Sequence, residues 1–297
     1  MPEDRRARLA AIRARTPEAI AEAAAARPRP ERPVDAAGRV FVIAADHTAR
    51  GMLGAGRRDM AMADRGDMLD RLCLALSRPG VTGVLGTPDV LEDLLLLGAL
   101  DGKAVFGSMN RGGLQGASWE IDDRFTAYDA AAIEAMRFEG GKMLTRIDYD
   151  DGATAGTVEA CARAVSDLAA RRLVAMVEPF LSRRVDGRLR SELTTQAAIR
   201  ASVIAAGLGA TSAYTWLKVP VVQDMERVIS ATTLPTVLLG GEVADDQDAT
   251  FASWQRALAV PGAIGLVVGR SLLYPPGDDV ADAVDTAAGL LPAEVAA

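Results

Sequence analysis

The feature that most constrains this chain is an alternation between short apolar runs and longer amphipathic segments, which begins after residue 38. Most of the apolar runs are continuous, which is typical of parallel strands buried on both faces. The alternation predicts strands at 40–46, 81–87, 103–109, 141–148, 172–180, 211–219, 235–241 and 263–269. It predicts helices near 59–77, 89–99, 127–138, 155–171, 194–207, 223–231, 246–259 and 277–290.

Eight β/α units in about 250 residues predict an α/β fold of the closed (β/α)8 type, the TIM barrel. A doubly wound open sheet is the alternative, but no Gly-x-Gly-x-x-Gly follows the first predicted strand. Because no long linker interrupts the pattern, we predict one catalytic barrel domain over residues 39–297. Residues 1–38 are rich in arginine and end in a proline-rich stretch, so we expect an N-terminal helical extension. Its acidic residues argue against a transit peptide.

The composition narrows the class of partner. The net charge of −7 and the lack of a basic stripe argue against nucleic acid. No run of about 18 apolar residues is present, so we expect no membrane span. Cys73 and Cys161 fall in predicted helices, and we expect reduced thiols in a cytoplasmic protein. We also expect a homo-oligomer, with the N-terminal extension packing on a neighbouring copy.

Lys218 lies inside the apolar run 214-YTWLKVPV-221, where a buried ammonium is costly unless it is paired or neutral. The chain has 33 basic residues, and only Lys103, Lys142 and Lys218 are lysines. A lysine can lose its proton and act as a nucleophile, whereas an arginine stays protonated. The alternative is that Lys218 extends its head group to solvent at the end of a strand.

Other polar residues fall at the carboxyl ends of the predicted strands, where the active sites of barrels form. Lys142 and Arg146 share one face of the fourth predicted strand with Asp148, because side chains alternate along a strand. Either Lys142 or Arg146 is a candidate for the cationic neighbour that activates Lys218. Asp46 and Glu178 end the first and fifth predicted strands, and they are candidates for proton transfer.

Glycines end the last two predicted strands, at Gly240-Gly241 and at Gly269-Arg270. At such turns, backbone amides can approach a phosphate closely, and Arg270 can add a bidentate contact. The turns after the seventh and eighth strands are the usual phosphate site of this fold. The alternative is that these glycines only form tight turns.

A metal site has little support, because His47 is the single histidine and no tight acidic cluster is present. We therefore expect neither a metal nor another cofactor, although carboxylates alone leave a magnesium site open. The run 244–248 is most simply a helix N-cap region. The long loop after the third predicted strand, 107–129, contains Asn110, Arg111 and 122-DDR-124. These residues are candidates to contact the hydroxyl or carboxylate end of a substrate, or to form a solvated loop.

Together these residues resemble the class I aldolases of the DeoC/LacD superfamily, over roughly residues 38–290. The superfamily includes archaeal-type fructose-bisphosphate, tagatose-bisphosphate and sulfofructose-phosphate aldolases. The chain looks most similar to an actinobacterial deoxyribose-phosphate-aldolase-like subfamily linked to inositol catabolism. The resemblance implies a Schiff-base lysine at Lys218, acids at Asp46 and Glu178, and no metal. It also implies phosphate-binding turns at Gly240, Gly241, Gly269 and Arg270. The tyrosine that archaeal enzymes use has its nearest counterpart in Tyr149, whose strand parity differs.

The resemblance implies cleavage of a phosphorylated keto sugar or sugar acid. Our preferred substrate is 6-phospho-5-dehydro-2-deoxygluconate, which would yield dihydroxyacetone phosphate and malonate semialdehyde. Cleavage of sulfofructose phosphate, tagatose or fructose bisphosphate, or deoxyribose phosphate is an alternative. Two other classes also stay open: a phosphosugar isomerase or epimerase with Glu178 as its base, and a non-catalytic barrel that binds sugar phosphates.

A metal-independent aldolase predicts that EDTA leaves carbon–carbon cleavage unchanged, because an iminium replaces the metal as the electron sink. The measurement is the cleavage rate before and after chelation, with a zinc-dependent aldolase as the positive control. A loss of rate that a divalent ion restores would assign the chemistry to a metal.

Overall fold

Eight parallel strands close into a barrel in the computed structural model, which describes residues 3–293. The ring runs β1, β2, β3, β4, β5, β7, β8, β9, and β9 pairs with β1 to close it. The predicted (β/α)8 fold is confirmed. Its strands are β1 (Val40–Ala45), β2 (Gly83–Gly86), β3 (Ala104–Ser108), β4 (Gly140–Ile147), β5 (Val174–Val185), β7 (Thr215–Pro220), β8 (Thr236–Leu239) and β9 (Ala263–Val268).

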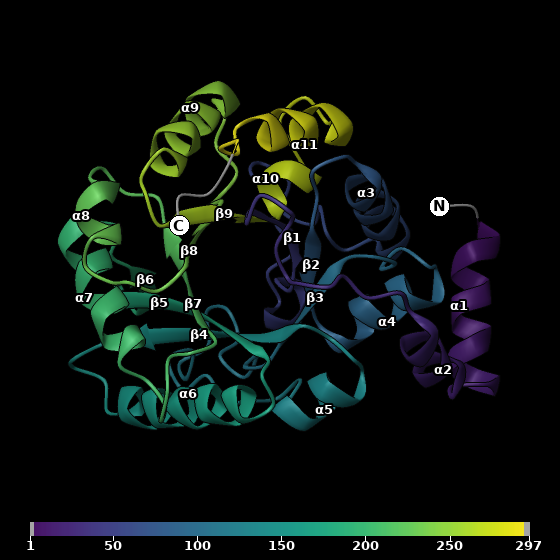
Figure 1. The fold of residues 1–297 in the computed structure, drawn as a ribbon, viewed down its shortest axis with the longest axis horizontal. Helices are drawn as coiled ribbons and strands as arrows, with labels where there is room; N and C mark the ends of the chain where they lie inside the picture. The colour runs from purple at the N-terminus through teal and green to yellow at the C-terminus, as the bar shows by residue number, and fades with distance from the viewer. Residues whose placement is uncertain (1–2, 294–297) are drawn as a thin grey trace.

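Helices surround the barrel on its outer side (Figure 1). They are α3 (Arg65–Ser77), α4 (Pro88–Leu96), α5 (Ala130–Ala135), α6 (Ala153–Ala170), α7 (Thr195–Ala206), α8 (Met225–Ile229), α9 (Gln247–Leu258) and α11 (Val280–Gly289). Two short helices, η1 (Thr48–Arg50) and α10 (Arg270–Leu273), lie in the loops that follow β1 and β9. Six helices begin at an Asp or Thr cap; Asp246, for example, accepts a hydrogen bond from the amide of Ala249 and starts α9.

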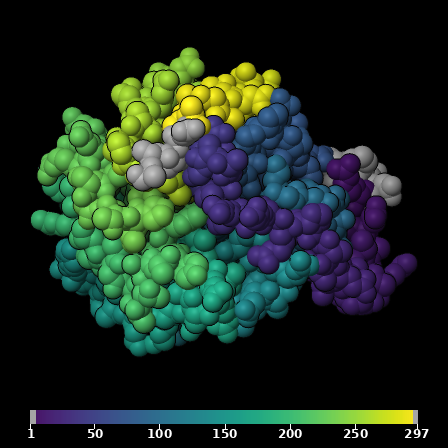
Figure 2. Space-filling view, viewed as in Figure 1, coloured from purple at the N-terminus to yellow at the C-terminus, as the bar shows by residue number. Residues whose placement is uncertain are grey.

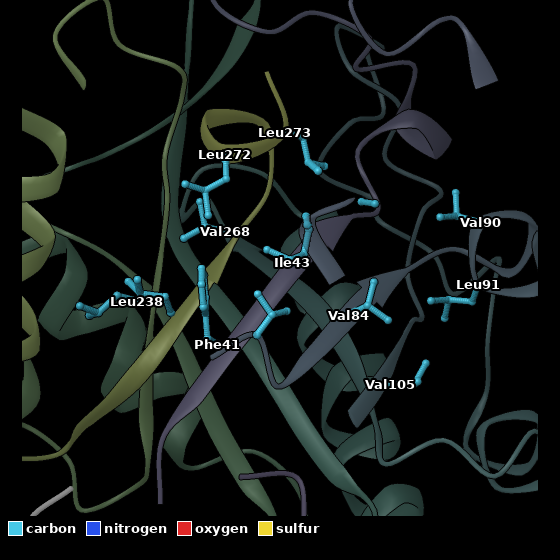
Figure 3. Close-up of a cluster of buried hydrophobic side chains, with 14 of the residues drawn as sticks. Phe41, Ile43, Val84, Val90, Leu91, Val105, Leu238, Val268, Leu272 and Leu273 are labelled. Atoms are coloured by element: carbon cyan, nitrogen blue, oxygen red, sulfur yellow. The ribbon is translucent and has the colours of Figure 1, made fainter. Parts of the chain in front are cut away.

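Two apolar layers result from the alternation of side chains along each strand. One set of residues fills the barrel interior, with Val42, Phe106, Met176 and Trp216 among its members. The other set faces the surrounding helices, and Figure 3 shows part of this outer layer around Phe41 and the strands beside it. Because the interior is filled by side chains, the barrel has a solid floor beneath its carboxyl-terminal end.

The fifth strand is longer than the sequence analysis predicted. It was expected to end at residue 180, whereas β5 continues to Val185 and turns back into the antiparallel strand β6 (Arg188–Ser191). Asp186 and Gly187 make the turn, both with positive φ. Asp-Gly is a strong signal for a two-residue hairpin, so the sequence contained the information that this prediction missed.

The N-terminal extension forms α1 (Glu3–Arg15) and α2 (Ala19–Ala26), which protrude at one side of the molecule (Figures 1 and 2). Arg13 pairs with Glu92 at 2.7 Å and with Asp93 at 2.9 Å on α4. Farther along, the buried Arg27 pairs with the buried Glu139 at 3.2 Å beneath the barrel. The extension therefore packs on the barrel of its own chain, and a further contact with a neighbouring copy stays a prediction.

Two other expectations can be compared with the described residues. Cys73 in α3 and Cys161 in α6 are free thiols. Between residues 3 and 293, no helix combines the length and the apolar character that a bilayer-spanning helix needs.

Barrel closure predicts that Gly265 tolerates no side chain. A Cβ at this position would lie 1.8 Å from the carbonyl oxygen of Val40 on β1. We expect Gly265→Ala to lower the free energy of unfolding by about 3 kcal/mol or more, because the β1–β9 pairing must distort. The measurement is urea unfolding followed by tryptophan fluorescence.

The matched control is Gly156→Ala in α6, where a Cβ meets no atom within 4 Å. This change should stabilise the protein by about 0.5–1 kcal/mol, since alanine is the better helix former. Equal stability of the two variants would contradict the prediction that the space at Gly265 is too small for a side chain.

Candidate active site

A cavity of about 1180 Å³ opens at the carboxyl-terminal end of the barrel. Residues from six barrel strands, from the loops that follow them and from the loop after β3 line it, with the filled barrel interior as its floor. Its lining includes Asp46, Lys142, Arg146, Glu178 and Lys218, and also Gly240, Gly241, Gly269 and Arg270. The structure therefore places these nine residues, each proposed from the sequence for catalysis or phosphate binding, at one cavity. Asn110 and residues 122–124, proposed as substrate contacts, do not line it.

Lys218 extends from β7 and is 4% exposed. Its register neighbour on the same strand face, Trp216, lies one step deeper and packs against Phe106 at a centroid distance of 5.8 Å. The Lys218 Nζ lies 2.8 Å from Glu178 Oε1. The ammonium group is therefore buried and paired, and it does not extend to solvent at the strand end.

Glu178 on β5 contacts two lysines, because its second oxygen pairs with Nζ of Lys142 on β4. Burial by itself would raise the pKa of Glu178, but the Lys142 and Lys218 ammonium groups outweigh it and lower the pKa to about 2. Glu178 is therefore an ionised bridge between two amines near neutral pH.

Asp46, which follows β1, anchors the other side of Lys142 at a distance of 3.2 Å. It also pairs with Arg111 at 3.0 Å and accepts a hydrogen bond of 3.1 Å from Ser108. Although burial opposes ionisation, Arg111 and Lys142 hold the pKa of Asp46 well below its usual range. Burial lowers the pKa of Lys142 to about 8, while Asp46 and Glu178 act in the opposite direction. Lys142 is thus the amine that can lose its proton near neutral pH.

Arg146 lines the cavity but does not join the Lys142 cluster. It lies two pleats farther along β4, on the same face, and pairs with Glu120 at 2.5 Å. Of the two candidates on this strand, Lys142 is the neighbour that shares a carboxylate with Lys218. Asp148 is buried in a turn and accepts from the amide of Asp150, and Tyr149 is 68% exposed. Neither Asp148 nor Tyr149 lines the cavity.

The glycine turns lie on the cavity wall formed by β8, β9 and their loops. A Cβ on Gly269 would lie 2.2 Å from the Ala44 carbonyl oxygen, and one on Gly240 would lie 2.4 Å from a methyl group of Val268. Gly241 has a φ of 69°, which glycine adopts without strain. Arg270 donates to the Gly54 carbonyl at 3.4 Å, while its buried Nε has no hydrogen-bond partner.

A family model described as Cgl0159-like matches residues 38–288. The chain belongs to the Cgl0159-like family. The crystal structure of Cgl0159 from Corynebacterium glutamicum is 51% identical to this chain. The alignment covers 98% of each chain, with a TM-score of 0.95. No curated protein matches the sequence.

This Cgl0159-like chain also shares its barrel fold with two archaeal structures. An archaeal fructose 1,6-bisphosphate aldolase is 18% identical over 92% of this chain and 98% of its own, with a TM-score of 0.66. Another archaeal fructose-1,6-bisphosphate aldolase structure has its catalytic lysine covalently bound to the carbinolamine intermediate of its substrate. It is 18% identical over 92% of this chain and 99% of its own, with a TM-score of 0.65.

The loop after β3 plays a larger part in the Cgl0159-like site than the sequence indicated. The Asn110 side chain bonds both the amide and the carbonyl of Leu144, which fixes the loop to β4. Arg111 extends back to Asp46, and the buried Asp123 pairs with Arg50. Sequence reasoning proposed substrate contacts for this loop, and it missed the support that Ser108 and Arg111 give to Asp46. The sequence did contain an indication for Ser108: it lies two residues after Phe106, at the end of β3, so both side chains share one face of the strand.

No group of three His, Cys, Asp or Glu side chains suited to holding a metal ion occurs within residues 3–293 of this Cgl0159-like protein. The candidate site is instead an ion-paired cluster of two lysines, one arginine and two carboxylates. Such a cluster can move protons and neutralise an anion.

His47 offers a direct test of the electrostatics of the Cgl0159-like site. Burial lowers its pKa to about 3, although Asp46 acts in the opposite direction. Because this pKa lies below the ordinary value, we expect a neutral imidazole from pH 8 to pH 5. As His47 is the single histidine, its ring proton resonances can be assigned directly and followed by NMR.

The lowered pKa of His47 also makes the stability of the fold depend on pH. Since the unfolded chain binds the proton first, His47 should make the native state lose stability as pH falls from 6.5 toward 3. Between pH 7 and pH 5, His47→Gln should reduce this loss by about 2 kcal/mol, measured by urea unfolding. An NMR titration midpoint near 6.5 would contradict both expectations.

Proposed function

We propose that this Cgl0159-like protein is a class I aldolase in which Lys218 forms a Schiff base with a phosphorylated keto sugar or sugar acid. The observation that carries the proposal is the buried pairing of Lys218 with Glu178, whose other oxygen contacts Lys142. A nucleophilic amine needs a proton acceptor within hydrogen-bond reach, and Glu178 occupies that position.

The first step is the release of the Lys218 amine. Lys142 has a pKa of about 8, so part of its population is neutral near neutral pH. A proton that passes from Lys218 through Glu178 to Lys142 frees the lone pair of Lys218 without changing the total charge of the cluster. Asp46 supports this relay because it holds Lys142 from the opposite side.

Schiff-base formation then follows at the cavity floor. The Lys218 nitrogen forms a bond to the ketone carbon, and the carbonyl oxygen takes a proton to give a carbinolamine. A second proton lets that oxygen leave as water, and the nitrogen lone pair forms the iminium. Glu178 contacts both lysines and passes both protons: the first is the proton that the attacking nitrogen releases, and the second returns from Lys142.

Carbon–carbon cleavage uses the iminium as the electron sink. A carboxylate removes the proton of the hydroxyl on the carbon next to the bond that breaks. The bonding electron pair moves to the iminium nitrogen, which gives an enamine and releases the aldehyde. Protonation of the enamine carbon and addition of water then release the ketone product and restore Lys218. We assign proton transfer to Glu178 and positioning of Lys142 and a substrate hydroxyl to Asp46.

The phosphate is proposed to bind at Gly240, Gly241, Gly269 and Arg270. This assignment is supported by their shared position on the cavity wall and by the unpartnered Nε of the buried Arg270. The backbone at both turns is open to a ligand because the glycines have no side chains. The preferred substrate is 6-phospho-5-dehydro-2-deoxygluconate, which carries its phosphate on the carbon beside the ketone.

The test is borohydride trapping with dihydroxyacetone phosphate, followed by intact mass measurement and peptide mapping. We expect one adduct, on Lys218, because reduction converts the iminium to a stable secondary amine. With only three lysines in the chain, mapping separates Lys218 from Lys142 and Lys103. An adduct with a phosphorylated aldehyde alone would indicate deoxyribose-phosphate chemistry. No adduct with any carbonyl compound would favour an isomerase or a binding protein.

Removal of the nucleophile gives a second measurement. Lys218→Ala should leave less than about 1% of the cleavage rate, because the covalent pathway itself is lost. Lys103→Ala is the matched control, since this lysine donates to the Val81 carbonyl and does not line the cavity. Circular dichroism of both variants reports whether the barrel is intact. Substantial cleavage by a folded Lys218→Ala variant would argue against covalent catalysis.

A further inference from the structure

The hairpin of β5 and β6 places two arginines at the mouth of the cavity. Arg188 and Arg190 are two residues apart on β6, so their side chains share one face of the strand. Both line the cavity, and both are exposed. Neither has an ion-pair or hydrogen-bond partner among the side chains of the described chain. The mechanism proposed above uses neither of them.

The charges around Arg188 and Arg190 make this pair of arginines unfavourable unless an anion binds to it. Arg183 lies opposite Arg190 in the hairpin register, and like charges directly opposite destabilise a strand pair. Arg183 is compensated by Glu192 at 3.6 Å and Arg184 by Asp151 at 3.3 Å. Arg188 and Arg190 lack such compensation, although the chain as a whole has a net charge of −7.

The cavity as a whole is basic. Its lining includes eight basic residues, Arg50, Arg111, Arg146, Arg188, Arg190, Arg270, Lys142 and Lys218, and five acidic ones, Asp46, Glu120, Glu178, Glu242 and Asp246. Glu178, Asp46 and Glu120 are already paired with Lys218, Lys142, Arg111 and Arg146. The cations without a carboxylate partner fall into two places: Arg270 after β9, and Arg188 with Arg190 on the hairpin.

These two places lie on different sides of Lys218. In the order of the ring, β7 with Lys218 stands between β5, which carries the hairpin, and β8 and β9, which carry the glycine turns. A ligand whose phosphate lies at Gly240 and Arg270, and whose ketone lies at Lys218, therefore has its other end directed toward the hairpin side. Arg146, on β4 next to β5, adds a third guanidinium to that side of the cavity.

We propose that Arg188 and Arg190 form a second anion subsite, which binds a carboxylate or phosphate at the end of the substrate opposite the first phosphate. This inference rests on the proposed function for the orientation of the ligand. Guanidinium groups form paired hydrogen bonds with either kind of anion. The subsite selects substrates with an anionic group at each end over ketose monophosphates.

The test compares three ligands that share a phosphate on the carbon beside the ketone. Fructose 1-phosphate has a neutral far end, fructose 1,6-bisphosphate has a phosphate there, and 6-phospho-5-dehydro-2-deoxygluconate has a carboxylate. Dissociation constants are measured by isothermal titration with the full chain carrying Lys218→Met, which keeps the aliphatic stem and prevents turnover. Whichever of the two charged ligands binds more tightly shows whether the subsite prefers a carboxylate or a phosphate.

We expect at least one of the two ligands with a charged far end to bind about tenfold more tightly than fructose 1-phosphate. In the Arg188→Gln/Arg190→Gln double variant, that preference should fall to about twofold or less, with little change for fructose 1-phosphate. The preference should also shrink as salt is raised, because the subsite is exposed.

Arg183→Gln is the matched control, since Arg183 belongs to the same hairpin but does not line the cavity. It should keep the preference for an anionic far end. Equal affinity for all three ligands, or a preference that survives in the double variant, would overturn the subsite. The readout needs no catalysis: a lasting preference without any Lys218 adduct would reject the aldolase alone, and an adduct without the preference would reject the subsite alone.

Discussion

One carboxylate between two buried ammonium groups is the interaction on which the candidate site depends. Glu178 contacts Lys218 with one oxygen and Lys142 with the other. Two unpaired ammonium groups at this depth would each carry a desolvation cost of several kcal/mol, and one unpaired carboxylate would be equally costly. The barrel supplies the geometry, because β4 and β5 are direct neighbours and β5 pairs on its other side with β7. The three side chains meet because their strands do.

The same arrangement explains why the neighbouring residues are polar. Lys142 would have an excess of positive charge around it if Glu178 were its single partner, and Asp46 supplies a second carboxylate. Asp46 in turn is held by Arg111 and Ser108, so the charges alternate across the floor of the cavity. The cluster is therefore one connected network of ion pairs and hydrogen bonds, in which the removal of one group leaves a buried partner without its counter-charge.

Much of this arrangement could be predicted from the sequence, for identifiable reasons. The continuous apolar runs fixed the strands, and the position of polar residues at their carboxyl ends brought Asp46, Glu178 and Lys218 to one cavity. The alternation of side chains placed Lys142 and Arg146 on one face of the strand, but it does not show which of them lies level with Lys218. The distinction came from the structure, where Arg146 lies two pleats above Lys142 and pairs with Glu120. Arg111 was named as a substrate contact, because no local pattern shows that its side chain folds back to Asp46. The hairpin was missed because the apolar run ended before its Asp-Gly turn.

The N-terminal extension changes what counts as the folding unit. The family match begins at residue 38, yet Arg27 and Arg29 lie before it and both pair with the buried Glu139. Glu139 also accepts a hydrogen bond from the amide of Val105 on β3, so it ties the base of the barrel to the extension. A chain trimmed to the matched region would leave a carboxylate inside the protein without its two cations, at a cost of about 3–5 kcal/mol. The boundary at which the family match begins is therefore not the boundary at which this protein can be cut.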